Sequence, residues 1–150
     1  MKKLLLLLVF ISGFAFGQLS QDSIQSIAKN YFEKEYVQQT FKDPYSYELK
    51  KIWSEPITKG SNLTTKIAQL ESMQKSSAFT NKQKKEFAVT LEKRKSELYK
   101  LSETEKNTVT AYAVYLDTYG ANSLGNKVLG KYTMTVDTAG NILGDIIKLN

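Results

Sequence analysis

Between residues 20 and 41, apolar side chains recur every three or four positions, with polar residues between them. The apolar stripe consists of Ile24, Ile27, Tyr31 and Phe32, and is extended by Tyr36, Val37 and Phe41. This spacing predicts an amphipathic helix over residues 20–41. Ser20 or Asp22 can cap its start, because either side chain can accept a hydrogen bond from a free backbone N–H of the first turn.

The pattern changes to an approximate period of two over residues 45–57. The alternating residues are Tyr45, Tyr47, Leu49 and Trp53. Such alternation predicts a β-strand with one buried face. Ile52 falls out of register, and a β-bulge near Lys50-Lys51 would reconcile the two halves. Pro56 lacks a backbone N–H, which favours a strand end or an edge strand.

Residues 61–106 are polar, contain no glycine or proline, and carry a narrow apolar stripe at helical spacing. The stripe consists of Leu63, Ile67, Leu70, Phe87, Leu91, Leu98 and Leu101. Ser76-Ser77 and Thr80-Asn81 mark a break, and Thr80 followed by Gln83 resembles a capping box. We therefore expect an antiparallel helical hairpin; the alternative is one long helix with a break.

Residues 108–149 alternate as β-strands do. Thr110, Tyr112, Val114, Leu116 and Thr118 share one face of the first strand, and Val109, Ala111, Ala113, Tyr115 and Asp117 share the other. A second strand runs through Tyr132, and a third covers residues 142–149. Gly140 can adopt the positive φ that closes a hairpin turn between them. These segments predict a three-stranded meander.

Together the elements predict an α+β fold. The first helix would pack on a four-stranded antiparallel sheet, and the helical hairpin would be an insertion between the first and second strands of one domain, residues 18–150. This arrangement buries the apolar faces of both helix and sheet. In architecture it resembles cystatin-like and nuclear-transport-factor-like (NTF2-like) proteins, folds that serve many functions.

The first seventeen residues have a separate pattern. Lys2 and Lys3 precede an apolar run from Leu4 to Phe16, and Ala15-Phe16-Gly17 supplies small residues at the positions that a signal peptidase reads. This is the pattern of a secretory signal peptide. We expect residues 1–17 to be removed and the protein to be exported to the periplasm or outside the cell, with no transmembrane segment in the mature chain.

The absence of both histidine and cysteine limits the chemistry. Ser-His-Asp and Cys-His catalytic systems and the usual zinc sites cannot be assembled without these residues. Catalysis would have to use Asp, Glu, Lys, Tyr or a Ser–Lys pair. We therefore expect no cofactor and no metal, and the sequence favours a protein that is not an enzyme.

Loss of Lys2 and Lys3 with the signal peptide lowers the formal net charge from +6 to +4. A mildly basic chain favours anionic surfaces. The lysines of residues 82–106 are interspersed with glutamates, so a solvated helix face is one interpretation and attachment to an anionic envelope surface is the other. The dilution by glutamate argues against a nucleic-acid partner.

One group of polar and aromatic residues could bind a ligand. It consists of Tyr112, Tyr115, Asp117, Tyr119, Asn122 and Ser123. Asn and Ser offer hydrogen bonds, and Tyr offers flat faces suited to sugars or peptides. The alternative for residues 119–126 is a long hairpin loop, in which Gly and Asn are present because they tolerate a left-handed backbone.

Two short segments carry a resemblance to known proteins. Lys42-Asp43-Pro44-Tyr45-Ser46 follows the first helix, and Asn122-Ser123-Leu124-Gly125 lies between two later strands. In this the chain resembles uncharacterised small exported proteins of Gram-negative bacteria. The resemblance covers the first helix and the β part, and implies fold but no catalytic residues. The alternative for Asp43-Pro44 is a helix stop followed by a turn.

Three functional hypotheses follow. The first is an exported, non-enzymatic module that binds an unidentified ligand, protein or envelope component, with a possible homo-oligomer through the apolar stripe of the helical hairpin. The second is attachment to the anionic cell envelope through the Lys-rich helices. The third is an enzyme that acts on a glycan or peptide without His or Cys, using Asp117 and nearby tyrosines.

Overall fold

The computed structural model describes residues 18–149, and the expected signal peptide, residues 1–17, lies outside the described residues. The helical elements are α1 (Gln21–Tyr31), the π-helix η1 (Phe32–Val37), α2 (Gln38–Thr40), the short 3₁₀ turn η2 (Pro44–Ser46), α3 (Lys59–Lys75), α4 (Asn81–Lys100) and α5 (Glu103–Lys106). The strands are β1 (Glu48–Thr58), β2 (Val109–Ala121), β3 (Lys127–Asp137) and β4 (Ile142–Leu149).

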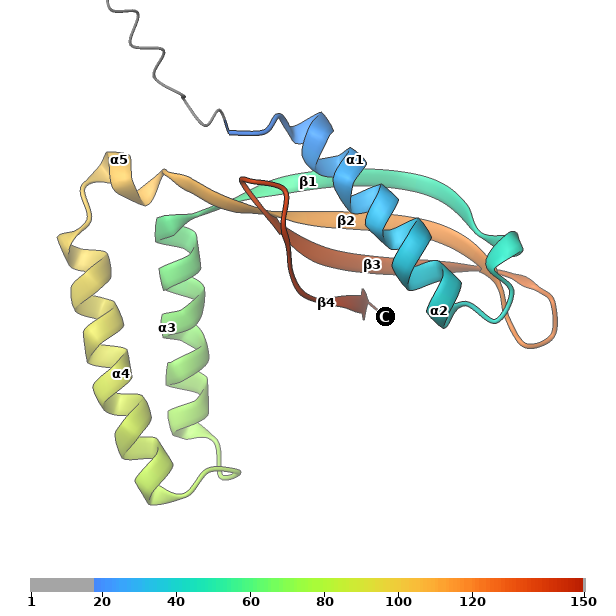
Figure 1. Cartoon of the computed structure of the whole chain (residues 1–150). Helices are drawn as coiled ribbons and strands as arrows, with labels where there is room; N and C mark the ends of the chain where they lie inside the picture. Colours follow the sequence, from blue (N-terminus) through green and yellow to red (C-terminus); the bar gives the residue numbers. More distant parts are fainter. Residues whose placement is uncertain (1–17, 150) are drawn as a thin grey trace, which may run out of the picture.

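The four strands form one antiparallel sheet in the order β1-β2-β3-β4. The helix from α1 to α2 lies along one face of this sheet, and α3 and α4 project from one end of it (Figure 1). The predicted α+β fold, with a helical hairpin between the first two strands, is confirmed.

The first helix is less regular than its sequence pattern predicts. Ser20 caps it by accepting a hydrogen bond from the backbone N–H of Ser23. Beyond Tyr31 the chain winds as a π-helix, whose wider turn brings residues five apart onto one face. Phe32 and Val37 are therefore both buried against the sheet. The helix ends at Thr40, one residue earlier than expected.

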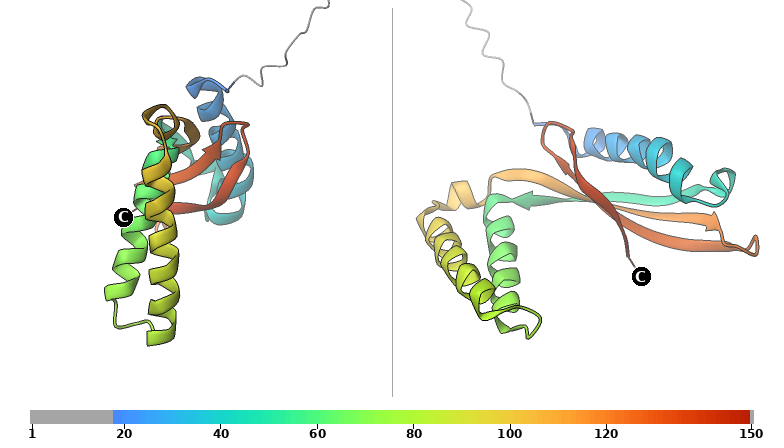
Figure 2. Two further views of the ribbon diagram at one scale, coloured as in Figure 1. Left: turned by 90° about the vertical axis from the view of Figure 1, so that its left-hand side faces the viewer. Right: turned by 60° about the horizontal axis from the view of Figure 1, so that its bottom comes forward.

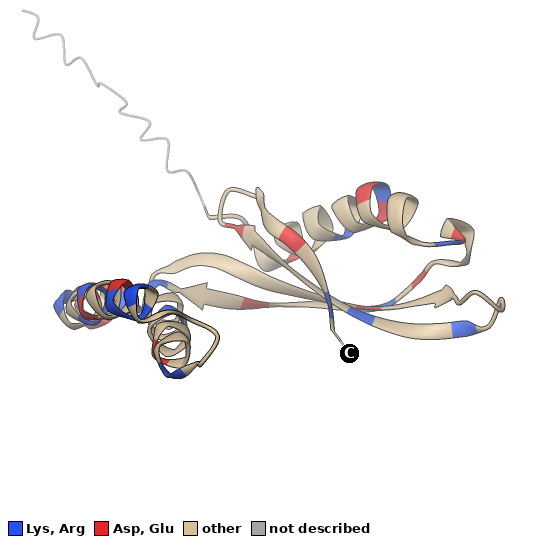
Figure 3. Cartoon of the chain, turned by 90° about the horizontal axis from the view of Figure 1, so that it is seen from below, with Lys and Arg blue, Asp and Glu red and all other residues tan. Residues whose placement is uncertain are grey.

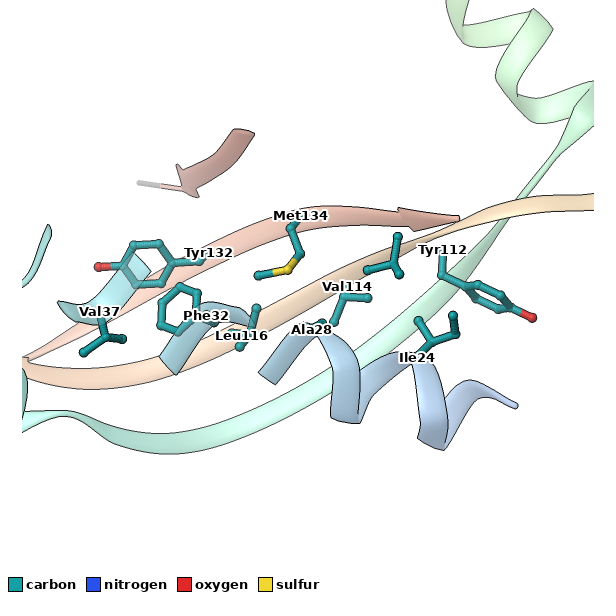
Figure 4. Packing of buried hydrophobic residues seen from close by; sticks show 10 residues of the cluster. Ile24, Ala28, Phe32, Val37, Tyr112, Val114, Leu116, Tyr132 and Met134 are labelled. Carbon is teal, nitrogen blue, oxygen red and sulfur yellow. The ribbon is translucent and has the colours of Figure 1, made fainter. Parts of the chain in front are cut away.

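The core lies between this helix and the sheet. Phe32 is completely buried and packs its ring against Tyr132, with 5.0 Å between ring centroids. Figure 4 shows these side chains between the helix and strands β2 and β3. The buried cluster consists of Ile24, Ala28, Phe32, Val37, Tyr112, Val114, Leu116, Tyr132, Met134 and Val136. Burial of this apolar area is the main force that holds helix and sheet together.

The first strand begins later than the alternation predicts. Tyr45 and Tyr47 precede it, and Tyr45 is 99% exposed. The Asp43 carboxylate accepts a hydrogen bond from the Tyr45 amide and closes a turn there. Local hydrogen bonding of this kind outweighs the tyrosine alternation. The predicted bulge is confirmed, because the register with β2 shifts between Leu49 and Lys51.

The insertion is a hairpin of two antiparallel helices, not one long helix (Figure 2). The predicted Thr80–Gln83 capping box starts α4. Leu63 and Leu91, two members of the expected apolar stripe, are buried. At the far end of the hairpin, Phe79 packs edge-on against Phe87 with 5.1 Å between ring centroids. Apolar side chains from both helices thus pack within the hairpin itself.

Candidate functional site

The pleat of β2 separates the predicted ligand-binding residues onto two faces. Tyr112 is buried under the helix, and its hydroxyl accepts a 3.3 Å hydrogen bond from the amide of Gln18. Tyr115, Asp117 and Tyr119 lie on the opposite face, because successive side chains of a strand alternate. The structure therefore does not bring Tyr112 together with the other members of the group.

We call the sheet face that α1 leaves uncovered the open face. Near its centre, Tyr115 of β2 is paired in register with Trp53 of β1, and the two rings stack with 5.1 Å between centroids and 16° between planes. The ammonium group of Lys51 lies 4.7 Å from the centre of the Trp53 ring. Cross-strand stacking and the cation–π contact hold both aromatic rings in place.

A recess of about 410 Å³ lies where the open face meets α3, and we call it the corner recess. Its lining comprises Glu55, Pro56, Ile57, Ser61, Asn62, Thr65, Lys66, Gln69, Ala113 and Tyr115. Figure 2 shows why it forms: α3 leaves the end of β1 on the side of the sheet opposite α1. The recess combines one aromatic ring with amide, hydroxyl, carboxylate and ammonium groups.

Asp117 lies on the open face beyond the corner recess and does not line it. In register it stands between Lys51 of β1 and Lys131 of β3. Its Oδ1 atom is buried without a hydrogen-bond partner. Asp117 therefore has cationic neighbours on both adjacent strands, but no position beside a ligand in the recess.

Tyr119 lies at the far end of the open face. Two lysine ammonium groups stand over its ring, Lys127 at 4.5 Å and Lys50 at 5.5 Å from the centroid. Lys127 also forms an ion pair with Glu48. Since two cations lie over its ring, Tyr119 belongs to a charged cluster and does not line the recess near Tyr115.

Asn122 and Ser123 lie in the connection between β2 and β3. The Asn122 side-chain oxygen accepts hydrogen bonds from the backbone amides of Leu124 and Asn126, at 2.9 and 3.0 Å. Ser123 is exposed. The geometry is that of a turn stabilised by an Asn side chain, as in the hairpin-loop alternative.

Sequence reasoning missed Trp53 and the polar side chains of α3 as members of a site. Trp53 faces Tyr115 only because the bulge after Leu49 sets the register of β1 on β2. Asn62 and Gln69 reach the recess because of the angle at which α3 leaves the sheet. Lys51 and Trp53 lie two positions apart in β1, and this spacing is a local signal for Trp53. No local pattern indicates the polar side chains of α3.

A second recess, of about 570 Å³, lies between the bases of α3 and α4, and we call it the cationic recess. It is lined by Lys59, Asn62, Leu63, Lys66, Arg94, Glu97, Lys100, Leu101 and Thr110. Arg94 donates a 2.7 Å hydrogen bond to Glu97. That bond holds the pKa of Glu97 below its usual range. Figure 3 shows charged residues of both signs along the hairpin and fewer on the sheet.

Within residues 18–149, no group of three or more Asp, Glu, His or Cys side chains is placed to hold a metal ion. Nor does this part of the chain contain a helix that combines the length and apolar character needed to cross a membrane. Comparison with protein-family models, with curated proteins and with solved structures found no match to the chain.

Proposed function

We propose that this chain is an exported binding module that is not an enzyme, and that its ligand is a glycan held in the corner recess. The observation that carries the proposal is the position of the Tyr115 ring, which lines the recess opposite the polar side chains of α3. Tyr115 is already held by Trp53, so binding would cost little ordering of its ring.

The lining favours a polyhydroxylated ligand. A sugar presents a C–H face that packs on an aromatic ring, and its hydroxyls both donate and accept hydrogen bonds. Asn62 and Gln69 have amides that do the same, and the Glu55 carboxylate accepts. The Ser61 hydroxyl is less available, because it donates to the carbonyl of Thr58 in the cap of α3.

Tryptophan fluorescence monitors this site directly, because Trp53 is the only tryptophan in the sequence. We expect soluble oligosaccharides of N-acetylglucosamine or glucose, titrated into residues 18–150, to give a saturable change in tryptophan fluorescence for at least one of the two. Gln69→Ala should weaken that binding about tenfold, since it removes a hydrogen-bonding group at the ligand. Ser72→Ala, at an exposed position of the same helix outside the recess, should leave it unchanged.

The absence of a fluorescence change with both sugars up to millimolar concentration would overturn the proposal. So would equal affinities in the wild type and Gln69→Ala. Tyr115→Ala provides a second check: it should abolish binding while circular dichroism shows the native content of helix and strand. Retention of binding without this ring would also contradict the assignment.

The cationic recess favours a second candidate function, attachment to an anionic envelope surface. Four cations line it against a single carboxylate, Glu97, which is already bonded to Arg94. Leu63 and Leu101 give it apolar walls. A lipid phosphate or an acidic glycan would neutralise this excess of positive charge.

Co-sedimentation with phosphatidylglycerol vesicles tests the second candidate. Binding should be strong at low ionic strength and weak at high ionic strength, because salt screens exposed charges. A triple substitution to glutamine at Lys59, Lys66 and Lys100 should reduce it. The matched control removes the same charge at Lys127, Lys131 and Lys148 on the sheet. Equal loss in both variants, or no binding at low salt, would reject this function.

The third hypothesis, an enzyme that uses Asp117, gains no support from this geometry, because Asp117 does not line the corner recess. Oligomerisation through the hairpin remains a prediction. Leu63 and Leu91 are buried within one chain, so a dimer would have to use the outer surface of the helices.

A further inference from the structure

A third recess, of about 240 Å³, lies between the end of the first helix and the far end of the sheet, away from α3. We call it the aromatic recess. It is lined by Tyr36, Thr40, Phe41, Lys42, Thr118, Gly120, Ala121, Asn122, Val128, Leu129, Gly130, Tyr132 and Lys148. Neither candidate function proposed above uses any part of it.

Two glycines on neighbouring strands shape its walls. A Cβ atom at Gly120 would lie 2.8 Å from the Phe41 ring, and one at Gly130 would lie 2.7 Å from the Tyr132 ring. Each ring therefore lies directly on the backbone of a strand. Phe41 and Tyr132 have 6.1 Å between their centroids. The recess is thus bounded by the aromatic rings of Tyr36, Phe41 and Tyr132 together with the aliphatic side chains of Ala121, Val128 and Leu129.

Residues 42–46 and 122–125, the two short segments singled out in the sequence, meet at this recess. Lys42 belongs to the first segment and Asn122 to the second, and both line it. The amide of Ala121, the residue before the second segment, donates a 2.7 Å hydrogen bond to the hydroxyl of Ser46, the last residue of the first segment. The walls of the recess are therefore connected by a hydrogen bond as well as by aromatic packing.

The polar groups of the recess point to a ligand with two polar ends. Thr118 is only 1% exposed, and its hydroxyl has no hydrogen-bond partner. A buried hydroxyl without a partner is costly, and a ligand that pairs with it removes the cost. Lys42 and Lys148 are exposed and lie on different elements, and no acidic residue is among the lining residues.

We propose that the aromatic recess binds a small phenolic carboxylate. Its ring would pack against the exposed edges of Phe41 and Tyr132, its phenol would pair with the Thr118 hydroxyl, and its carboxylate would face Lys42 and Lys148. The size is appropriate, since an apolar cavity of about 150 Å³ holds one benzene molecule and this recess is larger. Electrostatic attraction by two lysines selects an anion over its neutral analogue.

Nuclear magnetic resonance titration with 3-(4-hydroxyphenyl)propionate tests the proposal. We expect saturable shifts of the backbone amides of Thr118, Gly120 and Gly130. The neutral amide of the same acid should bind about tenfold more weakly, because it lacks the charge-assisted contact. The double variant Lys42→Gln, Lys148→Gln should bind the acid only as tightly as it binds the amide. Lys131→Gln, on the open face of β3, is the matched control.

Thr118→Val tests the phenol contact separately. This change removes an unpaired hydroxyl and keeps the shape, so the variant should fold. It should bind 3-phenylpropionate as the wild type does and lose the preference for the phenolic acid. The absence of saturable shifts in the wild type would overturn the proposal, as would equal binding of acid and amide, or shifts centred on Trp53 instead of Thr118.

Discussion

The backbone amide of Ala121, at the end of β2, donates a 2.7 Å hydrogen bond to the hydroxyl of Ser46 in the η2 turn before β1. The same hydroxyl donates to the carbonyl of Asp43 at 2.7 Å. One side chain thus satisfies two backbone groups and joins parts of the chain 75 positions apart. Ser46→Ala should lower the free energy of unfolding by about 1–2 kcal/mol. Urea denaturation followed by circular dichroism measures this.

Tyr45→Ala is the matched control for Ser46, since the neighbouring ring is 99% exposed. Its effect should stay within about 0.5 kcal/mol, as is usual for exposed positions. If both variants lost the same stability, the hydrogen bond to Ala121 would not be what holds this turn in place.

Phe32 is the side chain on which the packing of helix and sheet depends most. It is fully buried and contacts the rings of Tyr36, Phe41, Tyr47 and Tyr132. Phe32→Ala should lower the free energy of unfolding by about 3–5 kcal/mol, through lost burial and the cavity left behind. Chemical denaturation gives the value. A loss below about 1 kcal/mol would mean that the π-helical turn does not position this ring in the core.

The helical hairpin should unfold without the sheet. Its two helices pack mainly on each other, through Leu91 and its neighbours and an ion pair between Lys95 and Glu71 at 3.0 Å. Leu91→Ala should therefore raise amide hydrogen exchange in α3 and α4, while exchange in β2 and β3 stays as in the wild type. Tyr99→Ala, at a 90% exposed position on α4, should change neither. Faster exchange throughout the sheet would show that hairpin and sheet unfold as one unit.

Local signals predicted most of the architecture, and long-range geometry accounts for what they missed. The Ser20 cap, the Thr80–Gln83 capping box and the Gly140 turn each follow from a few adjacent residues. The bulge was visible because Ile52 broke the alternation. By contrast, the π-helical turn that buries both Phe32 and Val37 depends on the sheet beneath it.

In the candidate site, too, some features follow from local sequence patterns and others depend on long-range geometry. Alternation along β2 is enough to place Tyr115 and Asp117 on one face and to separate them from Tyr112. The partners of Tyr115 come from elsewhere: Trp53 through the register of β1, and Gln69 through the exit angle of α3. Neither relationship is a local property, because each depends on how distant parts of the chain pack together.

Alkaline pH should destabilise the fold through Tyr47. Burial, with a contribution from the negative charge of Glu33, raises the pKa of Tyr47 above its usual value. The folded state then favours the protonated phenol, so its contribution is fully present below about pH 10 and is lost as the pH rises beyond that. Tyr47→Phe should lose less stability than the wild type between pH 9 and about pH 11. Urea midpoints at several pH values measure the difference.

Tyr132, whose pKa burial also raises, remains in the Tyr47→Phe variant, so the alkaline loss should be reduced and not abolished. Tyr45→Phe is the control, because it removes a hydroxyl from a ring that is 99% exposed. It should follow the wild type over the same range. An identical pH response in wild type and Tyr47→Phe would show that the Tyr47 hydroxyl does not couple folding to alkaline pH.

Acid should weaken the turn between β3 and β4. Hydrogen bonds from the side chain and backbone of Asn141, at 2.8 Å each, and from the Ala139 amide at 2.9 Å hold the pKa of Asp137 below its usual value. Because the unfolded state takes up the proton first as pH falls, the stabilisation is present above about pH 4 and is lost below it. Asp137→Ala should be less stable than the wild type at pH 7, and the two should converge as the pH falls towards about 2. A difference that stays constant over this range would assign the effect of the substitution to lost packing, since the charge of Asp137 would then contribute nothing to the turn.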